Sequence, residues 1–595
     1  MTEKRPVAPV DPAALANTMS SISGECQRFL NQYWAGQLAR TNTAPDPLGV
    51  IPALQTLYQQ WLSHPDSLAR AQANLFQQYL GLWQNFAQRL WGLKTEPMVA
   101  PAPGDKRFRD SEWQTNPFFD FVKQSYLIAA NAMVKMSAET PDLDPHVARK
   151  AAFYVRQFAD ALAPTNFVAT NPEVLRTTLE SGGRNLVDGL RHLLEDFDPV
   201  HGTVKPRMVD DSQFELGENV ATSPGKVVFR NELMEIIQYA PSTERVKRRP
   251  LLIIPPWINK FYILDLQPKN SFIKWAVAQG HSVFVISWVN PGPELKDKDF
   301  EDYVFGGPLA ALDALEEITG ESSFNVIGYC IGGTLLGATL ARLRAHGDTR
   351  VASATFFTAL LDFSEVGDLS VFIDDEQIRN IEATTGARGF LEGREMAAAF
   401  NMIRANDLIW SFVVNNYLLG RAPAAFDLLF WNSDSTRMPA RMLSTYLRRM
   451  YRDNALREPG GISIQGEPVD LRRIDIPVCF VSAVEDHIAP WKSTYLGAQV
   501  LKGPVDFILG KAGHVAGIIN PPGPRAYDHY TGARVGKDSP EAWLEAATLQ
   551  KGSWWDTWAK WIDKHSGGEV AARTPGGKGK TLGDAPGSYV RVRLA

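Results

Sequence analysis

The most informative stretch of this sequence is Phe324-Asn-Val-Ile-Gly-Tyr-Cys-Ile-Gly-Gly-Thr334. An apolar run that predicts a buried strand leads through Gly-x-Cys-x-Gly into a run that predicts a helix. This is the pattern of a nucleophile elbow with cysteine in place of serine. Gly328 and Gly332 suit such a turn, because a Cβ would clash where strand and helix come together. The turn places Cys330 at a helix N-terminus, whose partial positive charge favours a thiolate, and we therefore predict that Cys330 is a nucleophile.

Short apolar runs alternate with helical stretches from about Val204 onward. Buried strands interleaved with helices indicate a mostly parallel sheet with helices on both faces. Together with the elbow, this pattern predicts an α/β protein with an α/β-hydrolase core. The predicted strands are Val227–Phe229, Leu251–Ile254, Val283–Trp288, Asn325–Ile327, Ala352–Phe357, Val478–Val481 and Asp506–Leu509.

Two loops downstream of the cysteine supply an acid and a histidine in the order that this fold uses, which is nucleophile, acid, histidine. One predicted strand leads into Ser482-Ala-Val-Glu-Asp-His487, and the last leads into Gly510-Lys-Ala-Gly-His514. Both loops follow strand C-termini, where catalysis gathers in open α/β sheets. We predict His514 as the base and Asp486 as its partner. Glu485 and His487 flank the aspartate and remain alternatives, with His487 placed among the substrate-binding residues as a neighbouring hydrogen-bonding group.

An oxyanion hole in such a fold uses the amide after the nucleophile, here that of Ile331, and a second amide from the loop after an earlier strand. The stretch Leu251-Leu-Ile-Ile-Pro-Pro-Trp-Ile-Asn259 fits the second position, since its two prolines end the strand. The amide of Trp257 or Ile258 is then free to face a substrate carbonyl, and Asn259 lies in the same candidate binding loop. The alternative is an ordinary loop ended by proline.

The domain organisation follows from where the strand pattern begins and where it is interrupted. Residues 1–203 have a helical pattern without the spacing of a catalytic site, and predict an all-helical N-terminal domain whose extreme N-terminus is mobile. Residues 204–595 form the predicted catalytic domain. About 363–472 is an aromatic-rich helical insertion between core strands, which favours a lid or dimerisation subdomain. The alternative is a set of ordinary core helices.

Composition excludes several classes of function for a chain of 595 residues. Lys and Arg number 61 against 66 Asp and Glu, a net charge of −5, so there is no basic field and nucleic acid is not an expected partner. The three cysteines show no metal-ligand spacing, so no metal is expected. No apolar run approaches the ~18 residues of a membrane span, and no secretory signal is evident. We expect a cytoplasmic protein.

Several motifs in this order resemble those of the class I polyhydroxyalkanoate synthases, which make poly(3-hydroxybutyrate). The resemblance rests on Gly328–Thr334, Pro255–Leu266, Glu485–Pro490, Gly513–Pro522, Phe426–Asp434 and Gly552–Trp555. It implies that (R)-3-hydroxyacyl-CoA is polymerised to a polyester with release of CoA, that Cys330 carries the acyl group, and that His514 and Asp486 complete a triad. No cofactor is implied, since the CoA thioester is the substrate. The resemblance further implies homodimers with Trp431 and the insertion near the contact, and action at polymer granules beside granule-coating proteins.

Two other functions fit part of the sequence. A cysteine hydrolase, such as a thioesterase, needs the same three residues, and these cannot separate transfer to an alcohol from transfer to water. The long insertion and the loops beyond the triad favour the synthase. A granule-coating scaffold with a degenerate hydrolase domain fits the helical N-terminal domain, but the intact triad argues against it.

Overall fold

The computed structural model describes residues 49–198, 203–577 and 579–593, and the predicted mobile N-terminus lies outside them. The chain divides into two compact units. One comprises Met1–Asp210 with Ala399–Ala425 and is mainly helical in its described residues, and is called the helical unit, and the other comprises Asp211–Ala398 with Phe426–Ala595. The division differs from the predicted boundaries, because the middle of the predicted insertion packs within the helical unit and not with the catalytic core.

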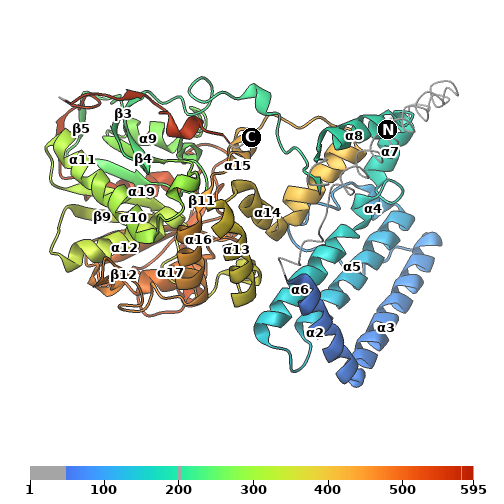
Figure 1. The fold of residues 1–595 in the computed structure, drawn as a ribbon. Helices are drawn as coiled ribbons and strands as arrows, with labels where there is room; N and C mark the ends of the chain where they lie inside the picture. The colour runs from blue at the N-terminus through green and yellow to red at the C-terminus, as the bar shows by residue number, and fades with distance from the viewer. Residues whose placement is uncertain (1–48, 199–202, 578, 594–595) are drawn as a thin grey trace. The chain divides into compact units, whose positions relative to one another are not determined.

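The described part of the helical unit consists mainly of helices, and four of the main ones begin at a proline (Figure 1). Proline suits the first turn of a helix because its missing N–H would have no partner there. Asn116, Asp144 and Asn171 cap three of these helices by accepting hydrogen bonds from amides of the first turn. The main helices are α2 (Val50–Ser63), α3 (Pro65–Leu90), α5 (Pro117–Ala138), α6 (Pro145–Ala161), α7 (Pro172–Glu180) and α8 (Arg184–Glu195).

The segment of the insertion that joins this unit packs against α8. Asn185 donates to the carbonyl of Leu418 at 2.7 Å, and Tyr417 donates to the buried Asp196 at 2.7 Å. A Cβ on Gly189 would lie 1.9 Å from the carbonyl oxygen of Tyr417, so only glycine permits this approach. The segment contains two short π-helices, η7 (Asn406–Trp410) and η8 (Val413–Leu418).

Within the described residues, the second unit is built on a sheet of eleven strands in the order β17-β16-β15-β14-β9-β8-β6-β7-β4-β3-β19. The six central strands, from β15 to β7, run parallel, and the outer strands join them antiparallel. All seven predicted strands are present. The strands are β3 (Gly225–Arg230), β4 (Met234–Tyr239), β6 (Leu251–Ile254), β7 (Val283–Trp288), β8 (Phe324–Tyr329), β9 (Val351–Phe357), β14 (Val478–Ala483), β15 (Val505–Gly510), β16 (His529–Thr531), β17 (Thr548–Gln550) and β19 (Gly583–Asp584).

Side chains of the central strands point alternately to the two faces of the sheet, and helices cover both faces. Val326 of β8 and Ala354 of β9 share a buried core with Leu335 of α12 (Ile331–Ala345). On β9 the next residue, Thr355, instead accepts a hydrogen bond from the indole of Trp558 in α19 (Trp554–Asp563). Successive side chains of a strand point to opposite faces, so α12 and α19 cover opposite sides. This confirms the predicted α/β-hydrolase layering, which Figure 1 shows at the left.

The rest of the insertion stays with the sheet unit. It comprises η6 (Gly367–Phe372), α13 (Asp375–Arg388), α14 (Gly393–Ile403, which crosses the unit boundary), α15 (Asp427–Ser433), α16 (Ala440–Thr445) and the π-helix η9 (Tyr446–Arg452). Among the described helices none is both long and apolar enough to cross a membrane. The described residues also contain no group of three or more His, Cys, Asp or Glu side chains placed to hold a metal ion.

Candidate active site

Cys330 occupies the sharp turn between β8 and α12. Its backbone has φ 53° and ψ −126°, a conformation that costs a non-glycine residue about 1–3 kcal/mol and is typical of active sites. The turn is held because the Cys330 amide donates to the carbonyl of Phe357 at 2.8 Å and the Cys330 carbonyl accepts from the Gly333 amide at 2.8 Å. The neighbouring strand and the following helix therefore impose the strain.

Three glycines make this turn sterically possible. A Cβ on Gly328 would lie 2.5 Å from the Cα of Gly333, and a Cβ on Gly333 would lie 2.3 Å from the Cβ of Ala359. A Cβ on Gly332 would lie 2.3 Å from the carbonyl oxygen of Ile254, at the end of β6. The first turn of α12 thus approaches the strand whose following loop carries the second predicted oxyanion amide.

His514 and Asp486 meet at the carboxyl ends of β15 and β14. The His514 ring nitrogen Nδ1 lies 2.7 Å from Asp486 Oδ2, and both residues are buried, with 7% of each exposed. The other carboxylate oxygen, Oδ1, accepts the amides of Ile488 and Ala489 at 2.8 Å each. These two bonds fix the carboxylate, which in turn orients the ring.

The electrostatics of the cluster favour a proton on the imidazole. Burial lowers the pKa of His514, but the charge of Asp486 and then that of Cys330 outweigh it and raise the pKa to about 10. Hydrogen bonds to both residues act in the same direction. His514 therefore has the affinity for protons that a base acting on a thiol needs.

The predicted oxyanion amides are available. In the part of the chain that the structure describes, the backbone N–H groups of Ile331, Trp257 and Ile258 have no hydrogen-bond acceptor. Asn259 pairs its backbone with Ser435. The arrangement places unbonded donors on the helix after the cysteine and on the loop after β6, as stabilisation of an oxyanion requires.

The two flanking alternatives differ from Asp486 in their surroundings. The Glu485 side chain is exposed, and its amide donates to the carbonyl of Ala512. His487 is partly buried and is not the histidine that bonds to Asp486. The structure thus brings Cys330, His514 and Asp486 together, and their catalytic roles remain predictions.

Aromatic residues that the sequence did not single out surround this cluster. The ring of Tyr329 stacks on that of His514, with centroids 5.8 Å apart. Tyr446 of η9 donates to the Thr334 hydroxyl in the first turn of α12. Tyr329 directly precedes Cys330 in the sequence, and this position could have indicated that its ring lies near the site. Nothing in the sequence connects Tyr446 with the elbow 116 residues earlier.

The fold and the site together define the class of the chain, which is that of α/β-hydrolase-type enzymes with a cysteine at the nucleophile elbow. A family model for the α/β hydrolase fold matches residues 249–521. A second family model, described as the poly-beta-hydroxybutyrate polymerase N-terminus, matches residues 104–276. The second match covers parts of both units.

Curated relatives specify the family. The chain is 46% identical over 586 residues to a poly(3-hydroxyalkanoate) polymerase subunit of Rhizobium meliloti, covering 98% of this chain and 96% of that one. It is 49% identical to a poly(3-hydroxyalkanoate) polymerase of Methylorubrum extorquens, over 91% of this chain and 89% of the relative. A subunit of Cupriavidus necator is 39% identical, with 91% of each chain covered. The chain belongs to the poly(3-hydroxyalkanoate) polymerase family and is an enzyme.

Proposed function

We propose that this enzyme polymerises short-chain (R)-3-hydroxyacyl-CoA, such as 3-hydroxybutyryl-CoA, into a polyester and releases CoA. The observation that carries the proposal is a cysteine at the elbow, in contact with a buried His–Asp pair, in a chain of the polymerase family. The reaction needs no cofactor, because the CoA thioester is itself the substrate.

In the first half-reaction the acyl group moves from CoA to Cys330. His514 takes the thiol proton, the sulfur attacks the thioester carbonyl, and the amide of Ile331 with that of Trp257 or Ile258 stabilises the oxyanion. When the tetrahedral intermediate collapses, the C–S bond to CoA breaks and His514 returns the proton to the CoA sulfur. One thioester replaces another at little cost in free energy, so the acyl group stays activated.

In the second half-reaction the 3-hydroxyl of a monomer or a growing chain attacks the Cys330 thioester. The hydroxyl is a weak acid, so His514 must take its proton during the attack, while Asp486 stabilises the imidazolium that forms. The C–O ester bond forms, the C–S bond breaks, and the proton passes to the Cys330 sulfur. The enzyme is then ready for another monomer.

The competing reaction is hydrolysis, in which water takes the place of the hydroxyl. It is not favoured, because relatives that align with 91–98% of this chain are named as polymerases. Incubation with 3-hydroxybutyryl-CoA separates the two. The proposal predicts CoA release together with insoluble polyester. CoA release with soluble 3-hydroxybutyrate and no polymer would support the hydrolase.

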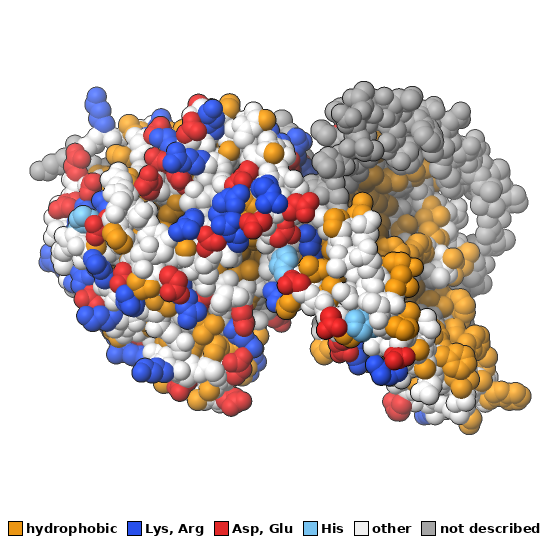
Figure 2. Space-filling view, turned by 60° about the horizontal axis from the view of Figure 1, so that its bottom comes forward, with side chains coloured by type: hydrophobic (Ala, Val, Ile, Leu, Met, Phe, Trp, Pro, Cys, Tyr) orange, Lys and Arg blue, Asp and Glu red, His pale blue; other side chains and the backbone are white. Residues whose placement is uncertain are grey.

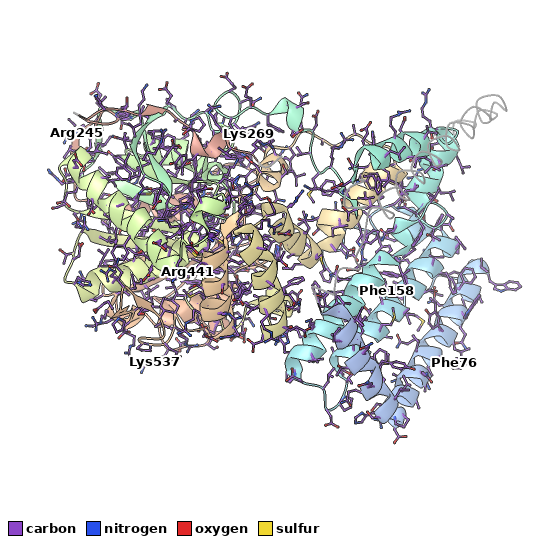
Figure 3. The ribbon with its side chains drawn as sticks, viewed as in Figure 1. Phe76, Phe158, Arg245, Lys269, Arg441 and Lys537 are labelled. Atoms are coloured by element: carbon purple, nitrogen blue, oxygen red, sulfur yellow. The ribbon has the colours of Figure 1, made fainter. Side chains whose placement is uncertain are left out.

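We also propose that the enzyme works in the cytoplasm at the surface of polymer granules. Support comes from large apolar side chains exposed on the helical unit, which Figure 2 shows as extended orange areas and Figure 3 illustrates with Phe76 and Phe158. Large apolar side chains exposed together on one part of a protein are typical of a surface that binds a partner or an apolar phase. The exposed residues include Tyr58, Leu62, Phe76, Leu80, Trp83, Leu90, Trp91, Leu93, Phe118, Phe158 and Leu162.

A homodimer is the oligomeric state that we propose, with the insertion near the contact and granule-coating proteins as further partners. Trp431 is 5% exposed and donates its indole N–H to the Lys260 carbonyl of the same chain at 2.7 Å. Any subunit contact near Trp431 would therefore use its more exposed neighbours. Sedimentation of the purified enzyme with and without substrate tests this state.

A further inference from the structure

We propose that Thr436 and Asp434 are positioning residues for catalysis, which hold the loop Trp257–Lys260 so that its amides face the developing oxyanion. The inference rests on the proposed function, since it assigns a task to the loop in that reaction. It adds two residues of the insertion, on a segment directly after α15, to the machinery of the site.

Thr436 holds the centre of the loop with two bonds. Its hydroxyl donates to the carbonyl of Trp257, and its amide donates to the carbonyl of Ile258 at 3.0 Å. Thr436 is 2% exposed and Trp257 is 1% exposed, so water does not compete for these bonds.

The loop is also held before Trp257. The indole of Trp288 donates to the carbonyl of Pro255 at 2.8 Å. A carbonyl and the following N–H belong to one planar group, so a bond to the carbonyl also orients that N–H. Pro256 has no N–H, so the Trp288 bond fixes the entry to the loop. The amide oriented in this way is that of Ile258, which shares a peptide group with the Trp257 carbonyl that accepts from Thr436.

Asp434 fixes the end of the loop through Lys260. The ammonium group lies 2.6 Å from Asp434 Oδ1 and also donates to the carbonyl of Val592 at 3.0 Å. Tyr262 donates to Asp434 Oδ2 at 3.0 Å. The carbonyl of Lys260 accepts the Trp431 indole, so both ends of this residue are bound.

The burial of this ion pair makes the arrangement rigid. Lys260 is 5% and Asp434 3% exposed, and burial lowers the pKa of Lys260 while the charge of Asp434 opposes the shift. Removing Asp434 would leave the buried Lys260 ammonium without its carboxylate, which is strongly unfavourable, and Arg593 lies 3.7 Å from the same Asp434 oxygen as a second cation. The loop is thus tied to residues more than 170 positions later in the chain, and these bonds lie next to the unbonded amides of Trp257 and Ile258.

The effect expected from a loosened loop is specific. Oxyanion donors act on the transition state, so their misplacement lowers kcat and leaves KM nearly unchanged. Loss of a whole donor costs about 10²–10³-fold in kcat, and a donor that is only less well positioned should cost less, about tenfold.

The test compares Thr436→Val with Thr436→Ser, using rapid-mixing measurement of CoA release from 3-hydroxybutyryl-CoA. We expect kcat to fall about tenfold in the valine variant at a KM within about twofold, and the serine variant to recover most of it. The matched control is Thr385→Val, which removes a buried hydroxyl that donates to the Ile381 carbonyl within α13, away from the loop. This control should retain wild-type kcat.

An unchanged kcat in Thr436→Val would overturn the proposal, as would an equal loss in Thr385→Val or in Thr436→Ser. Alkylation of Cys330 by iodoacetamide, which passes through no oxyanion, should proceed at the wild-type rate, and a slower rate would indicate general disruption instead. If the valine variant does not fold, Tyr262→Phe offers a milder change, because it removes only one bond to Asp434, and it should lower kcat about threefold. An unchanged kcat in that variant would refute the positioning role of Asp434. Because CoA is released whether the acyl group passes to an alcohol or to water, the result stands even if the wild-type product proves to be soluble acid.

Discussion

Replacing Asp486 by asparagine tests the arrangement of the active site most sharply, because the structure fixes how the new side chain must lie. Oδ1 of Asp486 accepts two amides, those of Ile488 and Ala489, and only an oxygen can replace it there. The asparagine NH₂ group must then occupy the place of Oδ2, 2.7 Å from His514 Nδ1, and it donates where the carboxylate accepted.

The consequence is the wrong tautomer of His514. A donor at Nδ1 requires that nitrogen to be unprotonated, so the ring proton moves to Nε2 and the ring can no longer accept the thiol proton. The corresponding aspartate-to-asparagine change in a serine–histidine–aspartate triad lowers kcat about 10⁴-fold, about 5 kcal/mol in activation free energy. The same variant loses the Asp486 charge, the largest of the influences that raise the pKa of His514 against the effect of burial.

CoA release from 3-hydroxybutyryl-CoA measures this effect for Asp486→Asn across a range of pH. We expect a loss of about 10⁴-fold at neutral pH and a residual rate that rises with pH, because hydroxide can deprotonate the thiol when the base cannot. Glu485→Gln is the matched control, since that side chain is exposed, and it should retain wild-type activity. A variant of Asp486 that keeps more than a tenth of the wild-type rate would refute the tautomer argument.

Three further predictions concern single residues. Gly332→Ala should destabilise the fold by about 3 kcal/mol, since its Cβ would lie 2.3 Å from the Ile254 carbonyl oxygen, and a wild-type urea midpoint would contradict this. Burial lowers the pKa of His281 to about 4, so its contribution to stability is present above the unfolded pKa of 6.5 and is lost as the pH falls through 4. Between pH 7 and pH 4 the free energy of unfolding should therefore fall by roughly 3 kcal/mol less in His281→Phe than in the wild type. The same fall in both proteins would count against this assignment. Cys479 is 0% exposed within β14, so Cys479→Ala should leave CoA release within about twofold, and a larger loss would implicate this thiol in the reaction.

The elements that could be predicted from the sequence are those whose pattern is local. The seven apolar runs became strands because continuous hydrophobic residues can be buried on both faces of a parallel sheet. The positions of the elbow and of the loops that carry Asp486 and His514 could be predicted from the order of strands and glycines along the chain. The site residues lie at strand C-termini, where the topology of the sheet brings them together.

The elements that were missed depend on partners far away in the chain. Strand β4 is fully buried yet contains Glu235 and Gln238, which interrupt its apolar pattern. These side chains bond to the amides of Ser588 and Gly576, more than 330 residues later. The edge of the sheet next to β3 has the same kind of cause, because β19 forms it from two residues, Gly583 and Asp584, that show no strand pattern, while Tyr589–Arg591 forms a 3₁₀ turn.

The division of the insertion between two units has the same cause. Contacts of Tyr417 and Leu418 with α8 involve residues more than 220 positions earlier, and no local pattern reveals them. The bonds from Thr436 and Asp434 to the loop Trp257–Lys260 could not be predicted either, since a threonine and an aspartate after a short helix are ordinary in sequence.

The most direct measurement is mass spectrometry of the whole protein, followed by peptide mapping, after brief mixing with 3-hydroxybutyryl-CoA. The expected result is a single hydroxybutyryl thioester on Cys330, which is absent from a Cys330→Ala variant that also releases no CoA. An adduct on another residue, or wild-type CoA release from Cys330→Ala, would contradict the proposed chemistry.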